Sequence, residues 1–106
     1  MIVIFEKEYL RDLYEVGKTN DKHHRFQPDI IKRYQNCIRA LIAAPDIQFL
    51  WKINSLRYEE LHGDKAGLSS IRVNNQYRIE FSVSEKSEEC RLTICNIIEL
   101  SNHYKK

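Results

Sequence analysis

Hydrophobic and polar positions alternate over residues 69–83 with a period of two, which is typical of half-buried β-strands. The apolar positions of the second half fall on one face: Tyr77, Ile79, Phe81 and Val83. The opposite face carries Arg78, Glu80 and Ser82. The preceding run, residues 69–73, alternates in the same way, with Ile71 and Val73 apolar and Arg72 between them. The pattern therefore predicts two strands joined by a short turn.

We expect the two strands to form an antiparallel hairpin with matching apolar faces, because directly opposed residues share a face. Val73 then faces Tyr77, and Ile71 faces Ile79. This register leaves Asn74-Asn75-Gln76 as a three-residue loop. We expect an Asn of this loop to adopt the left-handed conformation that such loops need.

The same register sets Arg72 directly opposite Arg78 on the polar face. Like charges in that position repel each other, so the pair is a poor choice on structural grounds alone. We interpret the pair as two guanidiniums that bind an anion between them. The alternative is a solvent-exposed Arg72 that pairs with Glu80 on the neighbouring strand.

The spacing of apolar residues predicts two helices in the N-terminal half of the chain. The first covers residues 6–16 and stops at Gly17. The second starts at Pro28, carries one apolar stripe and ends before Pro45. Residues 46–50 fit one more helical turn.

The remaining segments complete a small sheet. Residues 1–5 indicate a short strand, and residues 51–60 have no clear period. Residues 90–100 indicate the last strand, with Leu92 and Ile94 on one face. The predicted fold class is α+β: two N-terminal helices packed on one face of a small, mostly antiparallel sheet whose other face stays open to solvent. No repeat or linker is visible, so we expect the 106 residues to form a single domain.

Composition limits the kind of partner and cofactor. The chain holds 17 Lys and Arg against 15 Asp and Glu, so an anionic partner must be bound by a local patch rather than by a strong overall field. The cysteines at 37, 90 and 95 lack metal-ligand spacing, and the adjacent His23 and His24 lack further ligands. We therefore expect no metal and no cofactor. The apolar N-terminal run is too short for a signal peptide or a membrane span, so the expectation is a cytoplasmic protein without membrane contact.

Residues 61–83 resemble the RelE/ParE toxin superfamily and, within it, the HigB-like branch. In that branch a Lys-Gly-Asp-x-x-Gly loop leads into Ser-Ile-x-Val and then into Trp/Tyr-Arg-Ile. The corresponding segments here are His62-Gly63-Asp64-Lys65-Ala66-Gly67, Ser70-Ile71-Arg72-Val73 and Tyr77-Arg78-Ile79. The resemblance implies a RelE-like microbial ribonuclease fold.

The resemblance also implies a function. It points to a toxin of a type II toxin–antitoxin system that acts as a ribosome-dependent, metal-independent endoribonuclease on mRNA in the ribosomal A site. The implied partner is a cognate HigA-like antitoxin that binds DNA. This chain shows no helix-turn-helix signature, so we expect no direct DNA binding by it alone.

Cutting RNA needs a base for the ribose 2′-hydroxyl, an acid for the leaving 5′-oxygen and positive charge for the phosphorane. The catalytic candidates are Arg78, His103, Tyr104 and His62. The resemblance implies that Arg78 acts on the scissile phosphate, that His103 or His62 carries protons, and that Tyr104 orients a base or the 2′-hydroxyl. The RNA-binding candidates are Arg72, Lys65, Lys105 and Lys106. For His62, a loop histidine without a role is the alternative.

The chain departs from the HigB-like pattern at two places. Glu59 stands where the branch often carries a histidine, and Glu99-Leu100-Ser101 stands where it ends the last strand with Asp-Tyr-His. Either His103 and Tyr104 take over that terminal position, or the site is partly lost. Two alternatives therefore remain open: a ParE-like gyrase inhibitor without nuclease activity, and a catalytically degenerate module that binds an antitoxin.

Overall fold

The computed structural model describes residues 1–85 and 93–102. Within these residues the fold is α+β, as predicted, with three α-helices and a five-stranded sheet. The helices are α1 (Glu8–Glu15), α2 (Pro28–Ala43) and α3 (Ile47–Trp51), and two short 3-10 helices are η1 (Asn54–Leu56) and η2 (Gly63–Lys65). The strands are β1 (Ile2–Phe5), β2 (Glu59–Glu60), β3 (Leu68–Arg72), β4 (Arg78–Glu85) and β5 (Thr93–Ser101).

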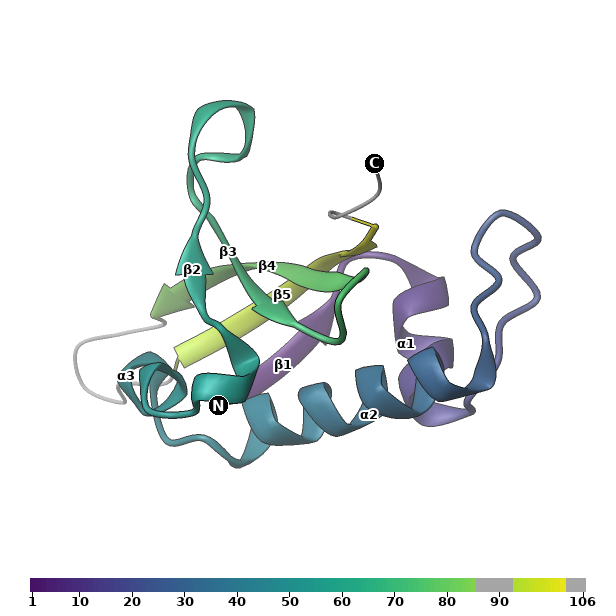
Figure 1. The fold of residues 1–106 in the computed structure, drawn as a ribbon, viewed down its shortest axis with the longest axis horizontal. Helices are drawn as coiled ribbons and strands as arrows, with labels where there is room; N and C mark the ends of the chain where they lie inside the picture. Colours follow the sequence, from purple (N-terminus) through teal and green to yellow (C-terminus); the bar gives the residue numbers. More distant parts are fainter. Residues whose placement is uncertain (86–92, 103–106) are drawn as a thin grey trace.

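The sheet has the strand order β1-β5-β4-β3-β2 (Figure 1). β1 pairs with β5 in parallel, and the other three pairings are antiparallel. The first strand of the chain therefore lies beside the last, and β2 forms the opposite edge. No helix in the described part of the chain is long and apolar enough to cross a membrane.

The β3–β4 hairpin has the predicted register. Ile71 pairs with Ile79, Arg72 pairs with Arg78, and the Val73 amide donates to the Tyr77 carbonyl at 3.0 Å. The expectation of a left-handed Asn is wrong, because no residue of the loop has a positive φ. The Asn74 side-chain oxygen instead accepts from the amides of Gln76 and Tyr77, at 2.8 and 2.7 Å, and this closes the turn.

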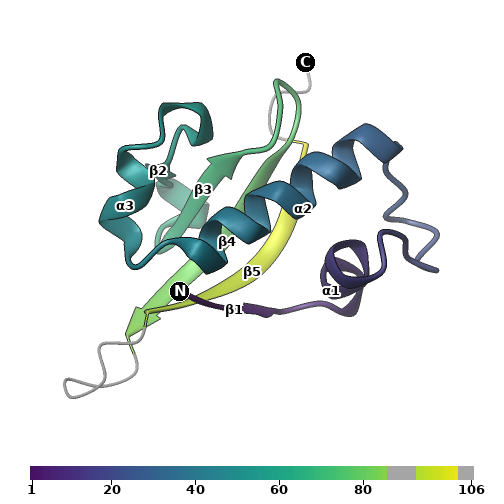
Figure 2. The same cartoon turned by 90° about the horizontal axis from the view of Figure 1, so that it is seen from below.

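One hydrophobic core joins helices and sheet, and α2 runs along the sheet in Figure 2. Its central members are Leu10, Leu13, Tyr34, Ile38, Leu41, Ile71, Ile79, Phe81, Cys95 and Ile97. The Tyr34 hydroxyl donates to the Leu10 carbonyl at 2.7 Å, which ties α2 to α1. Burial raises the pKa of this phenol, so the hydroxyl stays a donor at any physiological pH.

The helix limits agree with the sequence pattern, and the irregular segment gains some structure. α2 starts at Pro28 as predicted, and Gly17, with a φ of 85°, follows the end of α1. The short helix α3 begins after Asp46, whose carboxylate accepts from the Phe49 amide at 2.9 Å. Residues 51–60, which have no period, contain η1 and the two-residue strand β2.

The predicted shared face of Leu92 and Ile94 on the last strand stays a prediction. The core takes Cys95, Ile97 and Leu100, whereas Ile94 is half-buried and Leu92 lies outside the described residues. A β-bulge interrupts the alternation of β5, because Phe81 pairs with Ile97 while its neighbour Glu80 pairs with Glu99. Ile98 is thus an extra residue, and it shifts the alternation so that residues three apart reach the same face.

Part of the second face of the sheet is open to solvent, as expected, because Ile2 and Ile4 of β1 lie on it and are 41% and 48% exposed. The part formed by β3 and β4 is closed, contrary to expectation. Ser70, Arg78 and Glu80 alternate with the core residues Ile71 and Ile79 on β3 and β4. Their exposed fractions are 0%, 2% and 1%. Buried polar groups need hydrogen-bond or charge partners, so this face must carry its own network.

The bulge predicts unequal effects of two adjacent isoleucines. Ile97→Ala should lower the free energy of unfolding by about 2–5 kcal/mol, because it opens a cavity in the core. Ile98→Ala should cost about 1 kcal/mol or less, since Ile98 is half-buried at the bulge. Urea unfolding of both variants measures the difference. A regular strand with Ile94 facing the core would reverse the order.

Candidate functional site

Five side chains on the second face of the sheet form a polar cluster. They come from β2, η2, β3 and β4, and they are Glu59, Lys65, Ser70, Arg78 and Glu80. Figure 1 shows β2, β3 and β4 as neighbours in the sheet. The cluster combines two cations, two carboxylates and a hydroxyl: Lys65 contacts Glu80, and Arg78 contacts Ser70 and Glu59.

Arg78 lies at the centre of the polar cluster, with 2% of its side chain exposed. Its Nε donates to Ser70 Oγ at 2.9 Å, and its Nη2 donates to the Arg57 carbonyl at 2.6 Å. The same Nη2 lies 3.4 Å from Glu59 Oε1. A buried guanidinium is tolerated only with such partners, because losing its hydration is costly.

Glu80 and Lys65 form the second charge pair of the cluster. Lys65 Nζ lies 2.7 Å from Glu80 Oε2, and the two side chains are 39% and 2% exposed. Glu80 is also directly opposite Ser70 in the β3–β4 register. The contact thus joins η2, which precedes β3, to the sheet face that carries Glu80.

Glu59 is the most accessible carboxylate of the cluster. Its side chain is 52% exposed, against 2% for Glu80. A half-exposed carboxylate can move into solvent at little cost, whereas a buried one cannot. An anion that approaches Arg78 would therefore displace Glu59 first.

Arg72 and Arg78 are opposite in the sheet, as predicted, but their guanidiniums take different partners. Arg72 is half-buried and donates from Nη2 to Asn75 Oδ1 in the hairpin loop. Arg78 is turned into the polar cluster. An anion between the two would require Arg78 to be uncovered, and the alternative partner of Arg72, Glu80, binds Lys65.

Of the other predicted site residues, the structure brings Lys65 to Arg78's face but places His62 elsewhere. His62 is exposed and lines a hollow of about 490 Å³ with Tyr58, Glu60 and Ser69, on the sheet face opposite Ser70. His103, Tyr104, Lys105 and Lys106 lie outside the described residues. Their roles, and that of His62, stay predictions.

Three members of the polar cluster are absent from the sequence-based candidates: Glu59, Ser70 and Glu80. For two of them a signal existed, because the predicted register sets Ser70 against Glu80 on the face of Arg78. For Glu59 the signal was its position, where the resembling branch often carries a histidine, because residues 51–60 have no period of their own.

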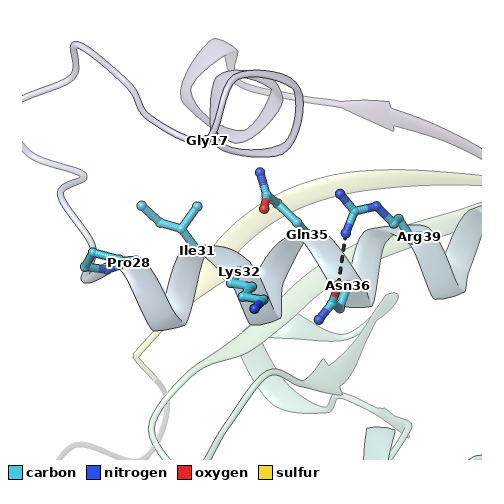
Figure 3. A pocket seen from close by; sticks show the side chains of 7 residues that line it. All are labelled: Gly17, Pro28, Ile31, Lys32, Gln35, Asn36 and Arg39. Carbon is cyan, nitrogen blue, oxygen red and sulfur yellow. Dashed lines mark hydrogen bonds between the residues drawn. The ribbon is translucent and has the colours of Figure 1, made fainter.

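A second hollow, of about 430 Å³, lies between the end of α1 and α2 (Figure 3). Gln35 points from α2 toward α1 and donates to the carbonyls of Leu13 and Tyr14 at 3.1 and 3.2 Å. The lining of this hollow contains Lys32 and Arg39 but no His, Asp, Glu or Cys. It therefore lacks a group that exchanges protons near neutral pH. Within residues 1–85 and 93–102, no group of three His, Cys, Asp or Glu could hold a metal ion.

His24 has a structural partner rather than further ligands. Its Nδ1 lies 2.9 Å from Asp21 Oδ2, and its ring stacks on Tyr9 with centroids 3.7 Å apart. The hydrogen bond from His24, followed by that from the His23 amide, lowers the pKa of the Asp21 carboxyl. These contacts fold the loop between α1 and α2 back onto α1.

Comparison with known proteins gives three matches. A family model for HigB-like toxins, described as the RelE-like toxin of the type II toxin–antitoxin system HigB, matches residues 3–92. Toxin HigB-1 of Vibrio cholerae serotype O1 is 34% identical over 85 residues, which cover 76% of this chain and 82% of that protein. A YoeB/ParE toxin structure from Agrobacterium tumefaciens matches with a TM-score of 0.61 and 21% identity, covering 98% of this chain and 100% of that one. At this identity the structural match shows the fold alone.

The Lys65–Glu80 pair predicts a measurable coupling. Lys65→Met should lower the free energy of unfolding by about 1–3 kcal/mol, because it removes a charge partner of the buried Glu80 carboxylate. Glu80→Gln in the Lys65→Met background should cost less than in the wild type. Urea unfolding of the four proteins measures the coupling, and Lys52→Met, at an exposed position, is the control. Simple additivity of the two changes would contradict the pairing.

The Asp21–His24 contact predicts a pH effect. A carboxyl with a lowered pKa adds stability that is present above its unfolded pKa and is lost as the pH falls through its folded value. Carbon-detected NMR titration should therefore place the Asp21 pKa below that of an ordinary aspartate. In His24→Ala the value should rise, because the main hydrogen bond is gone. An unchanged Asp21 pKa in that variant would show that the contact does not form in solution.

Proposed function

The chain belongs to the HigB-like toxins, the RelE-like toxins of type II toxin–antitoxin systems, and from this premise we propose that it cleaves mRNA on the ribosome as a metal-independent endoribonuclease. Membership of such a system implies a cognate antitoxin. We infer that this antitoxin is HigA-like and binds DNA, and that the toxin acts in the cytoplasm, where translated mRNA is found.

The observation that carries the proposal is a buried arginine beside a half-exposed carboxylate on one sheet face. Arg78 Nη2 lies 3.4 Å from Glu59 Oε1, and Lys65 lies in the same polar cluster. RNA cleavage needs a fixed positive charge for the phosphorane and a base for the 2′-hydroxyl. A guanidinium held by Ser70 and a backbone carbonyl supplies the first, and an accessible carboxylate supplies the second.

The reaction we propose combines two proton transfers with the formation of one bond to phosphorus and the breaking of another. Glu59 moves off Arg78 and takes the proton of the 2′-hydroxyl, and the 2′-oxygen forms a bond to the phosphorus. The bond from phosphorus to the 5′-oxygen breaks, and an acid gives that oxygen its proton. Arg78 stabilises the negative charge of the phosphorane. The products are a 2′,3′-cyclic phosphate and a 5′-hydroxyl, so atoms and charges balance without a metal.

His103 and Tyr104 are our candidates for the acid and for a group that orients the RNA. Two observations support them: Ser101 pairs with Arg78 in the β4–β5 register, and Asn102 follows directly. The chain thus enters its last four residues from a point next to the polar cluster. We give His62 no step, because it lines a hollow on the opposite sheet face.

We further infer that α1 and α2 cover only the core face of the sheet and leave the face of the polar cluster to RNA. The core residues of both helices pack with Ile71 and Ile79, which alternate with Ser70 and Arg78. On this arrangement Arg72, Lys65, Lys105 and Lys106 are the RNA-binding candidates.

A catalytically silent module that binds the antitoxin is the second candidate. The burial of Arg78 favours it, because a guanidinium that is 2% exposed cannot touch a phosphate unless the polar cluster opens. A ParE-like gyrase inhibitor has no specific support in the described residues.

Glu59→Gln is the sharpest test of the proposed activity. The change removes the base but keeps the shape, and the fold should survive it because the side chain is 52% exposed. We expect cleavage to fall by about 10²–10⁴-fold. Primer extension on cellular mRNA after induced expression, and on programmed ribosomes in vitro, measures the cuts. Glu60→Gln is the matched control, since Glu60 is exposed and adjacent but faces the other side of the sheet.

Cleavage at equal rates by Glu59→Gln and the wild type would contradict the role of Glu59. Growth arrest by the wild type with intact mRNA would favour gyrase as the target. If the wild type causes no growth arrest and no cleavage, the silent module is favoured.

A further inference from the structure

Arg57 adopts a backbone conformation that arginine normally avoids. Its φ and ψ are 45° and 54°, in the left-handed region. Among the described residues the other positive φ values all belong to glycines, at positions 17, 63 and 67. A Cβ makes this conformation unfavourable, and such outliers are kept where the surrounding structure or the function requires them.

The backbone of Arg57 supplies a hydrogen-bond acceptor to the polar cluster. The residue ends η1 and leads into β2, and its carbonyl accepts from Arg78 Nη2 at 2.6 Å. A glycine at this position would present the same carbonyl with less strain, because glycine adopts the left-handed region freely. The backbone alone therefore does not explain why the position carries an arginine.

The side chain of Arg57 differs from that of Arg78 in exposure. Arg57 is exposed, and no hydrogen bond or ion pair of its guanidinium to another described residue is found, whereas Arg78 is buried. Since the Arg57 carbonyl touches Arg78, the Arg57 side chain starts at the rim of the polar cluster.

We propose that the Arg57 side chain binds the RNA backbone at the rim of the polar cluster and positions the scissile phosphate for Arg78. The planar fork of a guanidinium suits a phosphodiester, and a contact outside the reacting bond serves binding more than the chemical step. The strained backbone is then the cost of having a cation, rather than a glycine, at this turn. This inference rests on the proposed ribonuclease activity.

The proposal predicts that stability and activity change in opposite directions. Arg57→Gly should raise the melting temperature by about 2–6 °C, because it relieves the left-handed strain. It should raise KM by about tenfold or more with kcat nearly unchanged, because one charged phosphate contact is lost. The slope of log KM against the logarithm of the salt concentration should fall by about one, which corresponds to one released ion.

Two further variants separate the effect of the side-chain charge from the effect of the backbone conformation. Arg57→Lys keeps the charge and the Cβ, so its melting temperature should stay near that of the wild type and its KM should lie between the wild type and Arg57→Gly. Arg39→Gln removes one exposed positive charge from α2, away from the polar cluster, and should leave KM unchanged.

The experiment measures thermal melting and mRNA cleavage on programmed ribosomes, at several salt concentrations, for the wild type and these three variants. A more stable Arg57→Gly with raised KM, partly rescued by lysine, supports the proposal. A more stable Arg57→Gly with wild-type KM, or a less stable Arg57→Gly, overturns it. An inactive wild type overturns the proposed ribonuclease and this inference together, whereas an active wild type with an equally active Arg57→Gly overturns this inference alone.

Discussion

The burial of the Arg78 guanidinium is the constraint on which the rest of the polar face depends. A buried cation must replace its lost hydration, and Arg78 does so with Ser70, the Arg57 carbonyl and Glu59. Two of these partners, the Arg57 carbonyl and Glu59, belong to the segment that runs from the end of η1 into β2. The segment is also held by Leu56 and Tyr58, which pack on the core, and by the pairing of β2 with β3, so the contacts of Arg78 add to these anchors.

The same constraint sets a conflict between stability and function. A cluster that satisfies Arg78 internally is stable without substrate, but it covers the charge that a phosphate would need. The structure holds a means to resolve this, because the partner of Arg78 on the solvent side is the half-exposed Glu59, while Glu80 and Ser70 are buried. Displacing this exposed carboxylate frees one contact of Arg78 while Ser70 and Glu80 stay buried.

The hairpin could be predicted from the sequence because alternation excludes every register that is one residue off, and pairing Ile71 with Ile79 leaves a short loop of three residues. The bulge at Ile98 could not, since an inserted residue leaves the composition of a strand unchanged and is visible only against its partner. The burial of the polar face was missed for a related reason. Arg78 and Glu80 indicate a solvent face until their long-range partners are known, and Glu59 and Lys65 come from segments without period.

The central claim is that RNA enters the polar cluster and replaces Glu59 on Arg78. The most direct measurement is the Nε–H signal of Arg78 in a nitrogen-resolved NMR spectrum, followed during titration with an RNA whose 2′-hydroxyls are methylated and which therefore cannot be cut. We expect this signal to shift and Glu59 to become more exposed, while residues lining the hollow between α1 and α2 stay unchanged. Binding that shifts the α2 residues and leaves the Arg78 signal in place would contradict the account.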